Sequence, residues 1–369
     1  MTDLFETTRI NTMTLENRFV RSATWEGMAA DDGAVTPGLT RLMTDLAQGG
    51  VGLIISSHAY VSREGQAGPW QLGVYTDDLI PGLQRMTGAV HDKGGKIVMQ
   101  LAHAGYHANG KLSGLVPVAP SAVEGIAKSP RQALTEEGLD AVVIAFTEAA
   151  RRAKQAGFDG VQIHAAHGYL LSQFLSPIYN QRTDAWGGEI QNRAKLLLAV
   201  LKAIRESVGP EYPVLIKMNC ADFFDNGLVL DDAIQVGKML AQEGLDAIEL
   251  SGGLLTGGKM SPSRMGIHTP EKEAYFQKEA MAFKTEVQVP LILVGGNRSY
   301  ETARQIVENG VADYISLCRP FIREPGLINR WRSGNLTKSA CLSDNKCFGP
   351  IMAGKGLLCV MDQKDRDVS

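Results

Sequence analysis

Apolar and polar positions follow one another along this chain in a pattern that predicts a repeating strand–helix unit. Short apolar runs recur at intervals, and stretches with helical periodicity separate them. Because the runs are almost continuously apolar, each is expected to be a strand buried on both faces, as in a parallel sheet. The eight predicted strands lie in NRFVRSA (17–23), VGLIISS (51–57), KIVMQL (96–101), GVQIH (160–164), PVLIKM (213–218), DAIELS (246–251), PLILV (290–294) and ADYISL (312–317).

Four of these strands follow a helix that is predicted to end at a glycine. Glycine readily adopts the left-handed conformation that closes many helices, and Gly50, Gly157, Gly244 and Gly310 each stand just before a strand. Between the strands lie helical patterns such as residues 135–155, which begin with a threonine and two glutamates. These residues favour a helix start.

Eight alternating strand–helix units predict an α/β fold with a single (β/α)8 TIM barrel. We predict that residues 1–333 form the barrel and residues 334–369 a C-terminal tail. Active sites in this fold lie at the carboxyl ends of the strands. The polar or small residues found there are Thr24, Gln100, His164, Lys217, Ser251 and Gly295.

Composition and charge narrow the classes of function. The 369 residues are 44% hydrophobic and carry a formal net charge of −3, which disfavours non-specific attraction to nucleic acid or membranes. The first residues lack the basic and apolar regions of a signal peptide. No apolar run reaches the roughly 18 residues that a membrane span needs. We therefore expect a cytoplasmic enzyme. Its 5 cysteines do not form the pattern of a secreted disulfide framework.

The polar stretch after the fourth strand carries the strongest chemical signal. His164 and His167 are three residues apart, and Tyr169 follows two residues later. Two imidazoles can donate hydrogen bonds to a developing oxyanion, while a phenol can give up a proton. The residues therefore indicate chemistry beside a carbonyl group. A metal pair or packed core histidines are the alternatives, although a catalytic metal usually needs three protein ligands and no third one stands nearby.

Motifs along residues 4–325 show a specific resemblance. They are LENRFV (15–20), MQLAHAG (99–105), IHAAHGYLLSQFLSPIYNQRTDAWGG (163–188), VGGN (294–297) and CRPFIREP (318–325). In this order they resemble the Old Yellow Enzyme family of FMN-dependent ene-reductases. Similarity is greatest to the branch that also forms the barrel of 2,4-dienoyl-CoA reductase and trimethylamine dehydrogenase. The resemblance implies FMN as cofactor and NADH or NADPH as reductant, with hydride passing through flavin N5 to the β-carbon of an α,β-unsaturated carbonyl compound.

The same resemblance implies roles for the candidate catalytic residues. His164 and His167 match the pair that holds the carbonyl oxygen of the substrate, and Tyr169 matches the proton donor. Trp25 stands where relatives often carry a small threonine or cysteine. It is expected to narrow the substrate pocket unless its ring turns away.

A second set of positions matches the FMN contacts of the family. Gln100 matches the glutamine that bonds the flavin pyrimidine, Lys217 matches the cation near N1 and O2, and Arg319 joins a glycine turn as a phosphate clamp. Ordinary strand-end polar residues are the alternative for Gln100 and Lys217. The predicted cofactor contacts are Ala23, Thr24, Trp25, His58, Gln100, Lys217, Gly295, Gly296, Asn297, Cys318 and Arg319.

The tail departs from the pattern of the cluster-bearing relatives. Those relatives hold a [4Fe–4S] centre with four cysteines, whereas this chain has Cys341, Cys347 and Cys359 with Asp344 at the second position. Because thiolates are the usual cluster ligands, we do not expect an iron–sulfur cluster. A cluster with one aspartate ligand, or a three-iron form, is the alternative.

Two other functions stay open at this point. One is an amine dehydrogenase or demethylase, in which Trp25, Tyr60, Trp70 and Tyr106 could form a cation-binding aromatic bowl. The other is a flavin- or phosphate-binding barrel without turnover. The chain has no G-x-G-x-x-G or Walker motif, so nicotinamide and substrate are expected to share one site. Expected partners are small molecules and further copies of this chain, and neither nucleic acid nor membranes.

Overall fold

The computed structural model describes residues 3–123 and 131–362, and their central feature is a closed barrel of eight strands. Each strand pairs in parallel with its neighbours, in the order β10-β11-β12-β3-β4-β5-β8-β9. The predicted TIM barrel is therefore confirmed. The strands are β3 (Phe19–Arg21), β4 (Leu53–Tyr60), β5 (Ile97–Ala102), β8 (Gly160–Ala165), β9 (Val214–Asn219), β10 (Ala247–Ser251), β11 (Leu291–Leu293) and β12 (Tyr314–Leu317).

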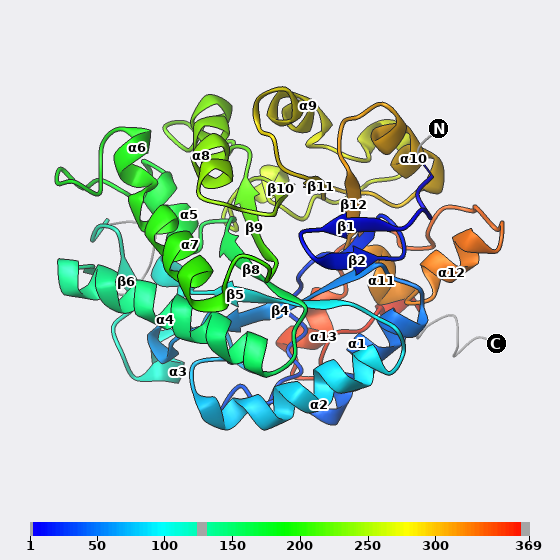
Figure 1. Ribbon diagram of the computed structural model, residues 1–369, viewed down its shortest axis with the longest axis horizontal. Coiled ribbons are helices and arrows are strands. Elements are labelled where there is room, and N and C mark those ends of the chain that lie inside the picture. Colours follow the sequence, from blue (N-terminus) through cyan, green and yellow to red (C-terminus); the bar gives the residue numbers. More distant parts are fainter. Residues whose placement is uncertain (1–2, 124–130, 363–369) are drawn as a thin grey trace.

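Helices surround the barrel (Figure 1). Those that follow the successive strands are α1 (Pro37–Gln48), α2 (Ile80–His91), α4 (Glu136–Gln155), α7 (Lys195–Val208), α8 (Leu230–Gln242), α9 (Gln277–Glu286), α10 (Tyr300–Glu308) and α12 (Leu327–Arg332). The sequence signals at α4 are used as expected. The Thr135 side chain accepts a hydrogen bond from Gly138 N, two glutamates lie in the first turn, and Arg152 and Lys154 lie in the last turn.

Shorter elements decorate this frame. The short helices are α3 (Gly110–Ser113), α5 (Leu170–Leu175), α6 (Ile190–Arg193), α11 (Arg319–Arg323) and α13 (Phe348–Met352), and a small parallel pair joins β6 (Val118–Ala119) to β7 (Gln132–Ala133). The 3-10 turns are Arg63–Gly65, Asp77–Leu79, Gly105–His107, Gly258–Met260 and Pro270–Lys272. Within the described part of the chain, no helix is both long and apolar enough to cross a bilayer.

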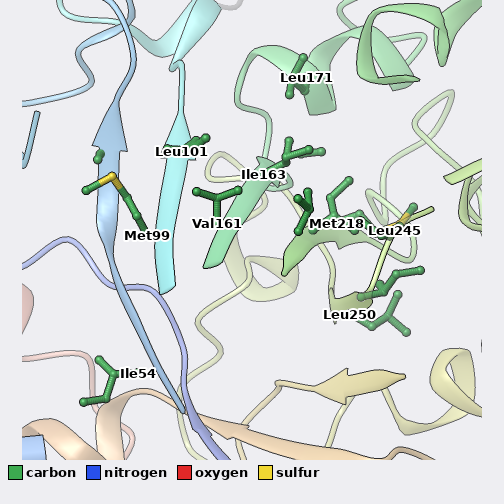
Figure 2. Packing of buried hydrophobic residues seen from close by; sticks show 14 of the residues in the cluster. Ile54, Met99, Leu101, Val161, Ile163, Leu171, Met218, Leu245 and Leu250 are labelled. Atoms are coloured by element: carbon green, nitrogen blue, oxygen red, sulfur yellow. The ribbon is translucent and has the colours of Figure 1, made fainter. Parts of the chain in front are cut away.

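Side chains along each strand alternate between the helices and the barrel interior. In β8, Val161 and Ile163 join the large cluster formed with the surrounding helices, as Figure 2 shows for the apolar side chains of neighbouring strands. The intervening Gln162 and His164 belong to the other face, which is the interior. Strand alternation therefore gives the barrel two separate cores.

The interior at the amino ends of the strands is apolar and is closed by a hairpin. The strands β1 (Thr8–Ile10) and β2 (Met13–Leu15) pair antiparallel. Asn11 at their turn bonds to Pro210 O and Asp246, which precede β9 and β10. Side chains of the hairpin and of the strands together form an apolar cluster inside this end of the barrel. Its residues are Ile10, Met13, Leu15, Val20, Leu53, Ile55, Val98, Leu215, Ala247, Ile292 and Tyr314. This hairpin was not predicted, because three-residue strands leave little periodicity to detect.

Candidate active site

A cavity of about 400 Å³ opens at the carboxyl ends of the barrel strands. Its volume is in the range of small-molecule and cofactor pockets. All of the predicted catalytic, substrate and cofactor residues line it, apart from Gln100 and Gly295. Those that do are Ala23, Thr24, Trp25, His58, His164, His167, Tyr169, Lys217, Gly296, Asn297, Cys318 and Arg319. Residues from seven of the eight strand ends and from the tail thus meet in one place.

His164, His167 and Tyr169 form a compact group of rings. The ring centroids of His164 and Tyr169 lie 4.7 Å apart, and those of His164 and His167 lie 5.5 Å apart. His164 is the last inward-facing residue of β8, whereas Tyr169 is the N-cap of α5. Between them the chain turns through His167, which has a positive φ of 62°. That conformation is costly for a residue with a side chain, so surrounding contacts must hold it.

Hydrogen bonds orient both imidazoles. The Ala166 N–H donates to Nδ1 of His164 at 3.4 Å, which leaves the His164 proton on Nε2. The backbone N–H of His167 donates to Asn219 Oδ1, and its Nε2 lies 2.8 Å from Ser251 Oγ. When the serine hydroxyl donates to Nε2, His167 carries its proton on Nδ1. Each ring then has one N–H to offer a ligand oxygen.

Burial sets the protonation of this group. Desolvation holds the pKa of His164 and of His167 well below its ordinary value, and the neighbouring rings and Lys217 add to the effect. Both rings are neutral at neutral pH. Burial also raises the pKa of Tyr169, so its phenol keeps the proton until a stronger base appears beside it. At neutral pH the group therefore consists of two neutral imidazoles and a protonated phenol, which can all donate hydrogen bonds.

His58 adds a further donor to the cavity. The Ala67 N–H donates to Oε1 of Gln71 at 2.7 Å, so the amino group of that glutamine faces Nδ1 of His58, 2.8 Å away. Nδ1 therefore accepts, and the His58 proton lies on Nε2. Burial lowers the pKa of His58 to about 4. Its ring lies edge-on to Tyr169 with centroids 5.6 Å apart.

The glycine turn after β11 forms the opposite end of the cavity. Gly295 and Gly296 both have positive φ, 139° and 77°. A Cβ on Gly296 would lie 2.8 Å from the Tyr275 ring, so a side chain there would not fit. Asn297 follows, with its amino group bonded to Leu293 O and Ser316 O and its buried Oδ1 without a partner in the described residues. A turn this bare exposes backbone N–H groups to an anion.

Arg319 lies at this same end, at the start of α11. Its Nη1 donates to Arg264 O at 2.9 Å and to Asn345 Oδ1 at 2.7 Å. These contacts fix the guanidinium in place and leave its other donors for a ligand. Asn345 belongs to the tail, and Ser343 and Phe348 of the tail also line the cavity. The tail therefore contributes to the Arg319 end of the cavity, which sequence reasoning missed.

Lys217 and Gln100 belong to a buried polar layer beneath the cavity. The Lys217 ammonium lines the cavity and donates to Ser22 Oγ at 2.6 Å. Gln100 lies deeper, because its amino group donates to Gln162 Oε1 at 2.7 Å. The same layer contains Glu249, which sequence reasoning also missed. The sequence did contain a signal for Glu249, because this acidic residue stands between apolar residues in a predicted strand. In the structure it pairs in register with Lys217 of β9.

The remaining predicted contacts lie near the end of β3. Thr24 Oγ1 is 3.1 Å from Cys318 Sγ, which joins the ends of the first and last barrel strands. Trp25 lines the cavity and packs against Gly68, where a Cβ would lie 3.3 Å from its ring. The tryptophan therefore does face the pocket. His107, which sequence reasoning missed, lines it as well.

The aromatic bowl considered for an amine substrate is wrong as an arrangement. Of its four candidates only Trp25 lines the cavity. The Tyr60 hydroxyl bonds to Asp32 O, Tyr106 packs edge-on to Tyr179, and Trp70 lies beside Gly354 of the tail. The four rings were grouped from the sequence alone. In the folded chain, strand alternation and the paths of the loops direct them to different places.

The tail cysteines meet around a second, much smaller space. Cys341, Asp344, Cys347 and Cys359 all line a cavity of about 20 Å³, which has room for about one water molecule. Across residues 3–123 and 131–362, no group of three or more histidine, cysteine, aspartate or glutamate side chains is placed to hold a metal ion.

The buried histidines predict a dependence of stability on acid. Burial lowers the pKa of both His58 and His107 to about 4, whereas an unfolded histidine titrates near 6.5. Between these values the unfolded chain binds more protons, so stability falls as the pH falls from about 6.5 to about 4. The loss per histidine is at most about 3 kcal/mol. Urea titrations of the wild type and His107→Gln at pH 7.5 and 4.5 should show a smaller loss in the variant. Equal losses would contradict the assignment.

Comparison with known proteins shows the family of the chain. A family model for the NADH:flavin oxidoreductase / NADH oxidase family matches residues 3–338. The chain is 32% identical over 95% of its length to 4,4'-dithiodibutanoate disulfide reductase from Rhodococcus erythropolis, of which it covers 93%. It is 34% identical over 87% of its length to an NADPH dehydrogenase from Halalkalibacterium halodurans, of which it covers 91%. It is also 35% identical to a metal reductase from Desulforamulus reducens, but spans only 54% of that protein.

Solved structures give the same result. The Old Yellow Enzyme homologue from Zymomonas mobilis superimposes with a TM-score of 0.79 at 30% identity, over 93% of this chain and 96% of that one. Morphinone reductase in complex with tetrahydroNAD superimposes with a TM-score of 0.76 at 29% identity, over 91% and 92% of the two chains.

Proposed function

Since the chain belongs to the NADH:flavin oxidoreductase / NADH oxidase family, the Old Yellow Enzyme family that binds FMN and uses NAD(P)H, we propose that it is an ene-reductase. Its substrate would be an α,β-unsaturated carbonyl compound. The single observation that carries this proposal is the group of His164, His167 and Tyr169 in the cavity that Lys217 and Arg319 also line. FMN, when bound, supplies the two-electron chemistry that connects nicotinamide to the carbon–carbon double bond.

The residues present fit FMN. The bare turn at Gly296 and the Arg319 guanidinium suit a phosphate, and the Lys217 ammonium suits the flavin edge that becomes negative on reduction. Arg319 and Lys217 reach the same cavity from different strand ends, Arg319 from the residue after β12 and Lys217 from β9. Asn297 Oδ1, buried without a partner among the described residues, is a further polar atom open to the group.

The two neutral histidines would hold the carbonyl oxygen of the substrate. Each offers one N–H, and both are fixed by contacts to Ala166, Asn219 or Ser251. When hydride arrives at the β-carbon, negative charge develops on the carbonyl oxygen. Fixed donors in a buried site stabilise such charge more strongly than water does, because they need no reorganisation.

Tyr169 would then deliver a proton to the α-carbon. Its ring packs against that of His164, with ring centroids 4.7 Å apart, and burial keeps its phenol protonated beforehand because it raises the tyrosine pKa. The reduction consumes one hydride and this one proton. The tyrosinate then recovers its proton from solvent.

Replacing Tyr169 by phenylalanine is expected to slow reoxidation of the flavin by an enone about 100-fold, at the low end of the range for a positioned proton donor. Reduction of the flavin by NAD(P)H should change less than threefold, because no proton from this residue is needed there. Stopped-flow measurement of the two half-reactions checks both numbers. Equal slowing of the two would remove the proton-donor role.

The proposed function is tested by the visible spectrum of anaerobically purified protein before and after addition of NADH or NADPH. A yellow flavin spectrum that bleaches with nicotinamide and recovers with an enone is expected. Bleaching by an amine without nicotinamide would instead support the amine dehydrogenase. Broad brown absorbance beneath the flavin would show that the tail cysteines and Asp344 hold an iron–sulfur cluster.

A further inference from the structure

Glu249 is a fully buried carboxylate in the middle of the barrel, with 0% relative exposure. It projects from β10 into the polar layer, where Ser316 Oγ donates to its Oε1 at 2.7 Å and Gln162 Nε2 donates to its Oε2 at 3.0 Å. Its Oε1 also lies 3.3 Å from the Lys217 ammonium. Both carboxylate oxygens are therefore engaged, and one faces a cation.

The carboxylate is ionised despite its burial. Desolvation raises the pKa of Glu249, but Lys217 and hydrogen bonds from Ser316, Ser22 and Gln162 outweigh it and leave the pKa below its ordinary value. Lys217 is itself only 4% exposed. The two opposite charges therefore form a buried pair directly under the cavity.

The three N–H groups of the Lys217 ammonium face different partners. One N–H reaches Ser22 Oγ at 2.6 Å, and a second faces Glu249. The third is available to the cavity that Lys217 lines. A ligand in the cavity therefore meets one N–H of a lysine whose positive charge is offset by the Glu249 carboxylate. It does not meet an unpaired cation.

We propose that Glu249 is a positioning residue for Lys217, which aims the ammonium at the bound FMN and offsets its charge, and so keeps the reduction potential of that FMN low. This inference rests on the proposed function, in which Lys217 faces the flavin edge that becomes negative on reduction. A lone buried ammonium would stabilise the reduced anion strongly. The paired ammonium stabilises it less, and the reduced flavin is then a better hydride donor.

The test compares the midpoint potential of FMN bound to the wild type and to Glu249→Gln. The amide keeps the shape, and its oxygen can still accept from Ser316. Its amino group can bond to Gln162 only after the Gln162 amide rotates, because Gln162 Nε2 now donates at that position. The negative charge is lost. The ratio of reduced to oxidised FMN at a fixed potential should rise roughly tenfold, which is a positive shift of ~30 mV for a two-electron couple. Dithionite titration against a redox dye measures this without any turnover.

Two further variants keep the comparison decisive. Glu249→Asp keeps the charge but draws it back from Lys217, so a smaller positive shift, about threefold in the same ratio, is expected even if the glutamine variant fails to fold. Glu273→Gln is the matched control. That carboxylate is only 5% exposed but bonds to Arg298 N and Ser299, so its removal should change the ratio less than twofold.

A background without Lys217 shows whether Glu249 acts through it. We compare the single variant Lys217→Met with the double variant Lys217→Met/Glu249→Gln. At a fixed potential, their ratios of reduced to oxidised FMN should differ less than about threefold. A tenfold difference that persists there would mean that the carboxylate acts on the flavin directly, and it would overturn the positioning role. An unchanged potential in both Glu249 variants would overturn the inference as well.

Failure of this inference and failure of the proposed function are separable. The potentials require only that FMN binds, and dithionite supplies the electrons. If nicotinamide and enone leave the bound flavin unchanged while Glu249→Gln still shifts its potential, the function is wrong and the role of Glu249 stands. If the wild type turns over enones and the potential does not move, the reverse holds.

Discussion

Replacing both His164 and His167 by alanine is expected to lower kcat/KM for a simple enone such as 2-cyclohexenone by at least about 1000-fold. Removal of one oxyanion donor typically costs about 100- to 1000-fold, and this variant removes both N–H groups that are proposed to hold the carbonyl oxygen. Steady-state kinetics at saturating nicotinamide measure the loss. The single variants should each lose about 100-fold.

The matched control for the histidine pair is His107→Gln. His107 lines the same cavity, but its Nε2 already lies 3.2 Å from the Tyr179 hydroxyl. Its replacement should change kcat/KM less than tenfold. If the double alanine variant behaved like this control, the carbonyl oxygen would have to be held elsewhere, and His58 Nε2 would be the first group to test.

Replacing Arg319 by alanine is expected to weaken FMN binding by about 100-fold or more. Loss of one partner from a buried charge pair costs about 2–5 kcal/mol, and the fork of donors that a guanidinium offers to phosphate is not replaced. Arg319→Lys should recover part of the affinity. Quenching of FMN fluorescence during titration of the apoprotein measures both values.

A control for Arg319 must remove an arginine without touching the cavity. Arg330 of α12 bonds to Glu324 and to Thr337 O and does not line the pocket, so Arg330→Ala should leave FMN affinity within threefold. Asn345→Ala tests the tail separately, because it removes the side chain that holds Nη1 of Arg319. Wild-type affinity in Arg319→Ala would place the phosphate away from this end.

The barrel strands were predictable because each one lies in a short, mostly apolar run. A strand such as PVLIKM must be buried on both faces, and the observed β9 spans Val214–Asn219 within one residue of that run. The hairpin at β1 and β2 was not predictable, since it packs against residues of seven barrel strands that meet only in the folded barrel. The same holds for the tail, whose Asn345 reaches Arg319 from 26 positions away.

The candidate site divides in the same way. His164, His167, Tyr169 and Lys217 could be named from sequence, because each stands at a strand end and carries distinctive chemistry. The residues that set their protonation and orientation could not be named from the sequence. Glu249 opposite Lys217, and Gln71 opposite His58, come from other strands or loops.

Local pattern was therefore enough for the barrel and for most of the predicted residues that line the cavity, since strand periodicity and strand ends are properties of consecutive residues. The family followed from the resemblance of motifs along the chain. Protonation, tautomer and charge balance depend on which groups lie within hydrogen-bond distance across the barrel. The neutral histidines, the compensated Lys217 and the Arg319 guanidinium held by the tail are consequences of closing eight strands into one ring. Only the tertiary structure decided them, because each involves side chains that the sequence keeps far apart.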